Sequence, residues 1–167
     1  TYVVGNILLL LLILAPSSIA PEINGAKSWF VFPFIGSLQP SELMKIFLII
    51  TLANVIATHH TKNVVKTVES DFKLLFKLCV ITGVPLLLVM QQPDLGTSLV
   101  LLAILAGMIF ASGITWKIIL PIFGTVTAGG GLILLLVIKF PEVLEKYLGV
   151  KEYQLGRIYS WLKPYDD

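Results

Sequence analysis

The feature that most constrains this chain is a series of long apolar segments that hold few charged residues. They run over residues 1–19, 40–58, 74–91, 97–113 and 117–138. An α-helix needs about 20 mostly apolar residues, with some latitude, to cross the hydrocarbon core of a bilayer. The pattern therefore predicts an all-α fold, a polytopic membrane helix bundle with about five transmembrane helices in this chain.

Composition agrees with a membrane location and narrows the possible partners. Hydrophobic residues make up 56% of the chain and charged residues 13%, and the mean hydropathy is +0.91. A water-soluble domain needs a far more polar surface than this. The net charge of +2, without a basic stripe carrying interleaved aromatic residues, gives no reason to expect a nucleic-acid partner.

No cofactor is evident from the sequence, although a divalent metal could join the chemistry. Cys79 is the single cysteine, which excludes an internal disulfide and a thiolate metal site within this chain. His59 and His60 are adjacent, and adjacent residues on a helix point in different directions. The pair is therefore expected at the membrane interface rather than on a metal ion.

The chain divides into a helix bundle over residues 1–138 and a more polar tail over residues 139–167. Apolar side chains recur in the tail at helical spacing, between lysines and acids: Val143, Leu144, Tyr147 and Leu148. This pattern predicts an amphipathic helix lying on the membrane surface.

The distribution of lysines predicts which segments face the cytoplasm. The segment 59–77 holds Lys62, Lys66, Lys73 and Lys77, and Lys117 opens the fifth apolar segment, whereas 15–40 and 91–96 together hold only Lys27. Cytoplasmic loops carry the excess of lysine and arginine. Residues 59–77 are therefore expected in the cytoplasm, and 15–40, 91–96 and 139–167 outside, although the basic residues of the tail weaken this count.

Asp94 lies in the polar stretch "QQPDLGT" between two apolar segments. A carboxylate here can cap the fourth helix by accepting from a backbone N–H two or three residues on. Capping alone does not ask for Gln91 and Gln92 beside it, and two amides with a carboxylate also suit a polar headgroup. Two interpretations stay open: Asp94 is a helix cap, or it is a catalytic candidate with Gln91 and Gln92 as substrate-binding candidates.

Glu42 and Lys45 follow Pro40, a residue favoured at the first position of a helix. Their spacing of three places them on one helix face, where they can form an ion pair. The helix dipole favours Glu42 at this end but disfavours Lys45. Ionisable residues within membrane spans are costly and usually face a protein interior or a wet cavity. The pair either orients the helix, with Lys45 extending to the interface, or binds substrate.

The connection 15–39 contributes Lys27 and Trp29, followed by several phenylalanines. Aromatic residues are typical of the membrane interface, which accounts for the phenylalanines. Trp29 beside Lys27 can instead line a groove for a lipid with an anionic headgroup, so both are substrate-binding candidates.

Four short motifs occur in order along the chain, each at a membrane boundary: "NGAKSWF", "QPSELMK", "QPDLGT" and "ASGITWK". Together they resemble the SEDS family of bacterial cell-wall proteins (RodA, FtsW and SpoVE). The resemblance covers nearly the whole chain. It implies that the chain is the central fragment of a larger protein of the bacterial cytoplasmic membrane, with residues 139–167 starting a large extracellular loop.

The resemblance also implies an enzyme, a peptidoglycan glycosyltransferase that polymerises lipid II into glycan strands at the outer membrane face. Its expected partners are a class B penicillin-binding protein and membrane lipids. By position, Trp29, Glu42, Lys45 and Asp94 match family residues that matter for activity. The family's best candidate for the general base lies beyond residue 167. No catalytic residue is therefore assigned here, and the fragment alone is expected to be inactive.

In the expected mechanism, a carboxylate deprotonates a sugar hydroxyl of one lipid-linked unit. That hydroxyl attacks the anomeric carbon of a second unit and expels its lipid pyrophosphate, which Lys45, Lys27 or Arg157 can stabilise. Two alternatives remain, a flippase that transports lipid II across the bilayer and a non-catalytic scaffold for the penicillin-binding protein. The polar candidates gather at one end of the spans rather than through the membrane depth, which favours the enzyme over the flippase.

Overall fold

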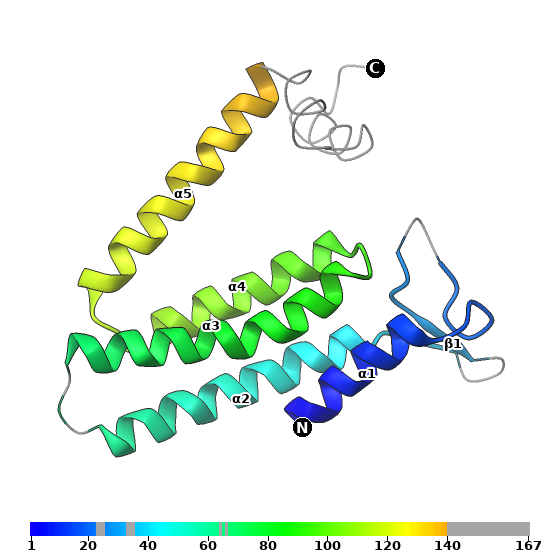
Figure 1. Ribbon diagram of the computed structural model, residues 1–167, viewed down its shortest axis with the longest axis horizontal. Coiled ribbons are helices and arrows are strands. Elements are labelled where there is room, and N and C mark those ends of the chain that lie inside the picture. The colour runs from blue at the N-terminus through cyan, green and yellow to red at the C-terminus, as the bar shows by residue number, and fades with distance from the viewer. Residues whose placement is uncertain (23–25, 33–35, 64, 66, 140–167) are drawn as a thin grey trace. The chain divides into compact units, whose positions relative to one another are not determined.

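The computed structural model describes residues 1–22, 26–32, 36–63, 65 and 67–139. The elements in chain order are helix α1 (Tyr2–Leu14), strands β1 (Phe30–Phe32) and β2 (Gly36–Leu38), and helices α2 (Pro40–Lys62), α3 (Val68–Met90), α4 (Leu95–Ala111) and α5 (Trp116–Lys139) (Figure 1). The chain forms two units, residues 1–119 and 120–167. The first unit holds α1 to α4 and carries the candidate site.

The predicted all-α membrane architecture is confirmed. Helices α2 and α3 have 23 residues each and are long and apolar enough to cross a membrane. Helices α1 and α4, and the stretch 116–132 of α5, are apolar but shorter. The predicted amphipathic tail helix, with Arg157, lies outside the described residues.

The polar segment between the second and third helices is shorter than predicted. Helix α2 continues to Lys62 and α3 already begins at Val68, so most of the predicted loop 59–77 is helical. Local contacts explain the early start of α3: the Thr67 hydroxyl accepts from the Ser70 backbone N–H at 3.1 Å, and Lys73 Nζ lies 2.6 Å from Glu69 Oε1. A cap and an ion pair four residues apart both stabilise a polar helix end.

The connection between α1 and α2 contains a short antiparallel ribbon that the sequence analysis did not predict. Phe30 of β1 pairs with Leu38 of β2, and Phe32 pairs with Gly36. Aromatic and β-branched residues favour strands, and Gly36 adopts a positive φ of 104°, which glycine tolerates best. The Val31 N–H also donates to the Ile19 carbonyl at 2.8 Å, which ties the ribbon to the chain that leaves α1.

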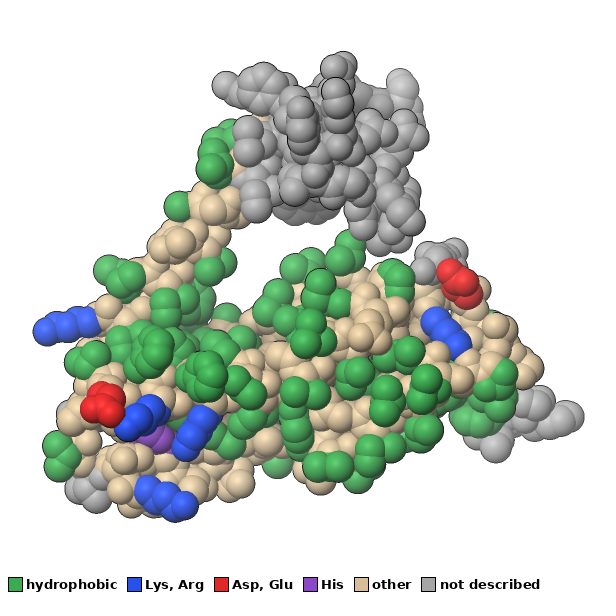
Figure 2. Space-filling model, in the orientation of Figure 1, with side chains coloured by type: hydrophobic (Ala, Val, Ile, Leu, Met, Phe, Trp, Pro, Cys, Tyr) green, Lys and Arg blue, Asp and Glu red, His purple; other side chains and the backbone are tan. Residues whose placement is uncertain are grey.

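Helices α1 to α4 pack around an interior of large aliphatic side chains. Fully buried residues come from all four helices: Leu9, Leu12, Met44, Leu48, Leu52, Leu74, Leu78 and Leu101. Many other large apolar side chains face outward, and Figure 2 shows them spread over the visible face of the molecule. Such an apolar exterior fits a lipid environment.

Helix α1 approaches α2 closely at a glycine. A Cβ added to Gly5 would lie 2.5 Å from Sδ of the buried Met44 and 3.0 Å from Cδ2 of Phe47. Small residues allow this close approach between membrane helices, where dispersion contacts and hydrogen bonds replace the hydrophobic drive of water.

A proline within α3 is matched by a hydroxyl from α1. Pro85 is buried and has no N–H, so the Ile81 carbonyl, four residues earlier, lacks its usual helical donor. The Tyr2 hydroxyl donates to that carbonyl at 2.7 Å. Backbone groups within a bilayer must find partners inside the protein, so this bond fixes α1 against one point of α3.

Candidate functional site

One end of the first unit collects segments that are far apart in the sequence. Helices α1 and α3 end there, α2 and α4 begin there, and the ribbon lies at the same end (Figure 1). Side-chain hydrogen bonds confirm the arrangement, because they connect Asp94 to Ser28 and Gln39, and Gln92 to Leu9. The described site candidates, spread from Lys27 to Asp94, all belong to segments that meet at this end.

Asp94 is the N-cap of α4, as one of the two interpretations predicted. Its Oδ1 accepts from the Thr97 backbone N–H at 3.0 Å, and its Oδ2 accepts from the Thr97 hydroxyl at 2.7 Å. The Asp94 carbonyl receives the Ser98 N–H at 3.1 Å and the Ser98 hydroxyl at 2.8 Å. The first turn of α4 is therefore held by one aspartate and two hydroxyl side chains.

The same carboxylate also binds two segments that precede α2. Oδ2 of Asp94 accepts from Ser28 Oγ at 3.3 Å and from Gln39 Nε2 at 3.4 Å. Ser28 is 5% exposed, and Gln39 is the N-cap residue of α2. Asp94 thus links the start of α4, the start of α2 and the connection before the ribbon.

Sequence reasoning missed Ser28 and Gln39. Both lie inside the quoted motifs: Ser28 in "NGAKSWF", between Lys27 and Trp29, and Gln39 in "QPSELMK", three residues before Glu42. A small hydroxyl and a lone amide carry no signal of charge or aromatic character. Their importance follows only from the position of Asp94, which is 66 residues after Ser28 and 55 after Gln39.

The predicted ion pair between Glu42 and Lys45 is present. Lys45 Nζ lies 2.8 Å from Glu42 Oε2, with the Glu42 side chain 58% exposed and that of Lys45 23% exposed. The pair lies in the first turns of α2, one turn after Gln39. Gln39, the residue before α2, connects this region to Asp94 through its side-chain amide.

Lys27 binds the end of α1. Its ammonium donates to the Ile13 carbonyl at 3.2 Å and also to the Ala15 carbonyl. The last carbonyls of a helix lack intrahelical partners and carry partial negative charge, so a cation there is stabilising. Lys27 therefore anchors the connection to α1, while the neighbouring Trp29 remains 37% exposed at the surface.

The two glutamines before Asp94 differ in environment. Gln91 is exposed, whereas Gln92 is 2% exposed and donates from Nε2 to the Leu9 carbonyl at 3.4 Å. Gln92 thus holds the turn between α3 and α4 against α1. Of the pair, Gln91 is the one that a ligand can reach. Arg157, the remaining substrate-binding candidate, lies outside the described residues.

The arrangement suits recognition of a polar, charged headgroup at a membrane surface. Asp94 is half-buried and surrounded by neutral hydroxyl, amide and backbone donors, so it can accept further hydrogen bonds from a ligand hydroxyl. Lys45 offers a cation in the first turns of α2, the helix whose N-cap residue Gln39 donates to Asp94. Among the described residues there is no group of three or more His, Cys, Asp or Glu side chains that could hold a metal ion.

Comparison with known proteins identifies the family. The family model described as "Cell cycle protein", named for FtsW, RodA and SpoVE, matches residues 1–167. The chain belongs to this family. The predicted SEDS membership is therefore confirmed over the full length of the chain. No solved structure matches it.

Several curated members of the FtsW/RodA/SpoVE family are similar to the chain. "Probable peptidoglycan glycosyltransferase FtsW" of Allochromatium vinosum is 32% identical over 163 residues, which cover 98% of this chain and 36% of that protein. The protein of the same name from Nitrosomonas europaea is 32% identical over 169 residues, covering 99% and 38%. "Peptidoglycan glycosyltransferase MrdB" of Helicobacter pylori is 36% identical over 100 residues, covering 59% and 25%. The chain thus spans little more than a third of the first two relatives.

Proposed function

We propose that the protein containing this chain is a peptidoglycan glycosyltransferase that polymerises lipid II into glycan strands for bacterial cell shape or division. The observation that carries the proposal is the match of the whole chain to relatives that bear this enzymatic name. The convergence of Ser28, Gln39 and Asp94 at one end of the bundle supports it, because a membrane-bound substrate with a polar headgroup needs such a site at the bilayer surface.

The proposed topology is a multi-pass protein of the cytoplasmic membrane, with the Asp94 end outside. The opposite end of the bundle supports this orientation. Lys62 closes α2, Lys73 and Lys77 lie in the first half of α3, and Lys117 opens α5. Lysines concentrate on the cytoplasmic side of membrane proteins. In this orientation 15–40, 91–96 and 139–167 are extracellular.

In the proposed mechanism, Asp94 orients the acceptor sugar by accepting a hydrogen bond from one of its hydroxyls. The 4-hydroxyl attacks the anomeric carbon of the donor unit, the bond from that carbon to the pyrophosphate breaks, and the hydroxyl proton passes to a general base. We place that base in the part of the protein beyond this chain. Holding two reactants in the right geometry supplies a large share of the barrier reduction in group transfer.

Lys45 is the proposed cation for the leaving pyrophosphate. Its side chain is 23% exposed and already oriented by Glu42, so little entropy is lost when it meets an anion. A fixed cation that faces developing phosphate charge stabilises the transition state. Trp29 and Gln91 extend the proposed binding surface, and Lys27 acts by holding the connection in place.

The proposal includes a class B penicillin-binding protein as partner and membrane lipids as surroundings, and it includes no resident cofactor. A divalent ion would arrive with the substrate's pyrophosphate. Magnesium usually keeps several waters and binds through one or two carboxylates together with substrate phosphates. Asp94 and Glu42 are two described carboxylates at this end of the bundle that suit such a role.

The test uses the full-length protein, purified with its penicillin-binding partner and supplied with lipid II. Glycan strand length and rate are measured for wild type, Asp94→Asn and Glu42→Gln. Asparagine caps a helix as well as aspartate does, so Asp94→Asn removes the charge while α4 keeps its cap. We expect both variants to slow strand growth by about tenfold or more, as misplacement of reacting groups does.

Glu69→Gln is the control, because Glu69 also forms a helical ion pair with a lysine, Lys73, but at the other end of the bundle and with both side chains more exposed. It is expected to polymerise at the wild-type rate. If folded Asp94→Asn and Glu42→Gln make strands of wild-type length at the wild-type rate, neither residue takes part in the site. Lipid II flipping in vesicles without strand growth from wild type would support a flippase. Partner binding without any activity would support a scaffold.

A further inference from the structure

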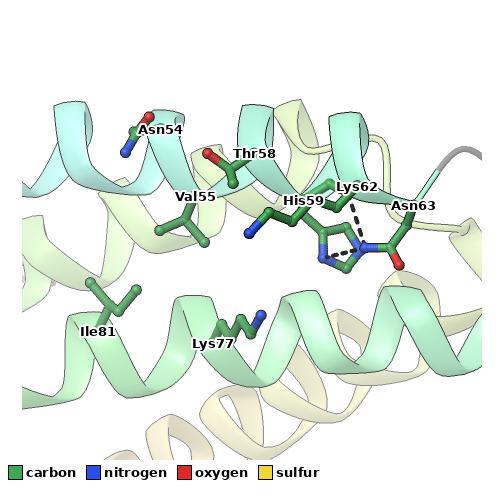
Figure 3. Close-up of a pocket in the computed structure, with 8 residues that line it drawn as sticks. All are labelled: Asn54, Val55, Thr58, His59, Lys62, Asn63, Lys77 and Ile81. Atoms are coloured by element: carbon green, nitrogen blue, oxygen red, sulfur yellow. Dashed lines mark hydrogen bonds between the residues drawn. The ribbon is translucent and has the colours of Figure 1, made fainter.

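A second polar site lies at the opposite end of the first unit, in a cleft between α2 and α3. The cleft has a volume of about 280 Å³ and is lined by Asn54, Val55, Thr58, His59, Lys62, Asn63, Lys77 and Ile81 (Figure 3). Ligand pockets for drug-sized molecules start at about this volume. The cleft is separate from the Asp94 region, since its lining residues come from the last turns of α2 and from the middle of α3.

The cleft is positively charged. Figure 3 shows Lys62 and Lys77 extending from the two helices into the space between them. None of the residues that line the cleft is Asp or Glu. The ion pairs found among the described residues join Lys45 to Glu42 and Lys73 to Glu69, so neither cleft lysine has a carboxylate partner there. Two ammonium groups that face one space repel each other, and an anion between them removes that cost.

The remaining polar wall of the cleft is rigid. His59 is buried, and its Nε2 is 2.9 Å from Ser70 Oγ of α3. Asn63 donates from Nδ2 to the His59 carbonyl at 3.0 Å, which is one of the contacts drawn in Figure 3. The C-terminal end of α2 is therefore tied both to itself and to α3, so the two lysines extend from a fixed frame.

The charged and apolar parts of the cleft lie at different depths. Lys62 is the last residue of α2, whereas Val55 lies about two turns earlier in the helix. On α3, Ile81 lies about one turn beyond Lys77, further from the helix start. Both helices are long enough to cross a membrane, so their ends reach the headgroup level. Lys62 thus lies at headgroup depth, Lys77 lies nine residues after the start of α3, and each lysine has an aliphatic side chain of its own helix on its membrane-interior side.

We propose that this cleft binds the phosphate group of an anionic phospholipid. Lys62 and Lys77 contact the phosphate, and the first acyl carbons lie against Val55 and Ile81. An inorganic phosphate would use the lysines but not the apolar wall, so the lipid is the better match. The proposal does not rest on the glycosyltransferase activity, because the cleft shares no residue with the Asp94 site.

A competing explanation is that these lysines attract anionic lipids only in a diffuse way. Lys62 also lies in the last turn of α2, where a cation stabilises the helix end. The test must therefore compare removal of the cleft lysines with removal of two other lysines at the same end. Lys73 and Lys117 serve this purpose, since neither lines the cleft.

The experiment measures binding of dihexanoyl phosphatidylglycerol to the full-length protein in a neutral detergent by isothermal titration calorimetry. A lysine near a phosphate at a membrane surface contributes enough that its loss weakens binding about fivefold. We expect Lys62→Gln and Lys77→Gln each to show this loss, and the double variant to bind about 25-fold more weakly. In the control double variant, Lys73→Gln with Lys117→Gln, the affinity should stay within about twofold of the wild-type value.

Any other result would overturn part of the proposal. If the control double variant binds the lipid equally weakly, diffuse electrostatic attraction, and not binding in the cleft, accounts for the affinity. Unchanged binding in the cleft variants, checked for folding by circular dichroism, would exclude the site. If the double variant does not fold, the two single variants test the site instead. Lys62→Arg and Lys77→Arg keep the positive charge and are expected to retain binding. Inorganic phosphate that binds as tightly as the lipid would overturn the assignment to a phospholipid.

Discussion

Replacing Tyr2 by phenylalanine removes the hydroxyl that donates to the Ile81 carbonyl at 2.7 Å and keeps the aromatic ring. Because Pro85 offers no N–H, that carbonyl then has no donor from its own helix. The variant therefore tests whether a backbone group opened by a proline is satisfied from a neighbouring helix. The bond spans 79 residues, so its loss weakens the contact between α1 and α3 rather than either helix alone.

The expected loss of stability follows from two ranges of hydrogen-bond energies. Leaving a buried acceptor without a partner costs about 1–3 kcal/mol in proteins generally. Hydrogen bonds between membrane helices average about 0.6 kcal/mol and reach about 1.7 kcal/mol. Ile81 lies well inside α3, far from either end of the helix, so competition from water is weak. We expect Tyr2→Phe to lower the free energy of unfolding by about 1.5 kcal/mol, near the top of the membrane range.

Pro85→Ala turns this expectation into a double-mutant cycle. Alanine restores the N–H four residues after Ile81, so the carbonyl regains its helical donor. In that background Tyr2→Phe should cost less than about 0.5 kcal/mol, which gives a coupling energy of about 1 kcal/mol between the two positions. The measurement is equilibrium unfolding of the full-length protein in bicelles.

Thr51→Val is the matched control for loss of a hydroxyl. Thr51 Oγ1 donates to the Phe47 carbonyl, also at 2.7 Å, but this carbonyl keeps the Thr51 backbone N–H as its helical donor. The control should cost less than about 0.5 kcal/mol. The reasoning is refuted if Tyr2→Phe costs the same with Pro85 and with alanine at that position, or if Thr51→Val costs as much as Tyr2→Phe.

Three further predictions use the same unfolding assay. Gly5→Ala should destabilise by about 1 kcal/mol, because its Cβ would overlap Met44, whereas Gly83→Ala, with nothing within 4 Å, should be neutral or stabilise by up to about 1 kcal/mol. Equal effects at both glycines would contradict the close approach of α1 and α2. Lys27→Gln should cost about 0.5–1 kcal/mol, because the last carbonyls of α1 lose a cation, and an unchanged midpoint would show that this contact contributes nothing. Asp71→Asn should cost about 1.5–3 kcal/mol, because the buried Asp71 carboxylate accepts from the Thr115 backbone N–H, in the turn before α5, at 2.9 Å. A cost below about 0.5 kcal/mol would refute that role.

Contacts between residues close in sequence could be predicted, because local geometry decides them. Asp94 caps Thr97 three residues on, and Lys45 pairs with Glu42 three residues back. Both follow from the pitch of the helix and the chemistry of its first turn.

Contacts across long separations could not be predicted in the same way. Nothing in the sequence near Gln92 indicates that its amide meets the Leu9 carbonyl, 83 residues earlier. Apolar helices can pack in many rotations of similar energy, so polar contacts between them depend on details of shape. Pro85 does signal that a carbonyl of α3 needs an outside donor, but it does not indicate that Tyr2 supplies it.

The ribbon between α1 and α2 was missed for a related reason. Phe30, Val31 and Phe32 suit both a membrane interface and a strand. The choice depends on whether a partner strand lies beside them, and β2 contributes only Gly36–Leu38, too short to be recognised as a strand from its residues.

The four donors around Asp94 are not equivalent, and this has a consequence for how the site would respond to a ligand. The two Thr97 contacts, at 3.0 and 2.7 Å, belong to the cap of α4, while Ser28 and Gln39 donate over 3.3 and 3.4 Å. A sugar hydroxyl that binds this carboxylate displaces the weaker donors first. If the site binds a sugar as proposed, occupancy would loosen the contacts that Asp94 makes with Ser28 and Gln39, and with them the connection between α4 and the segments before α2.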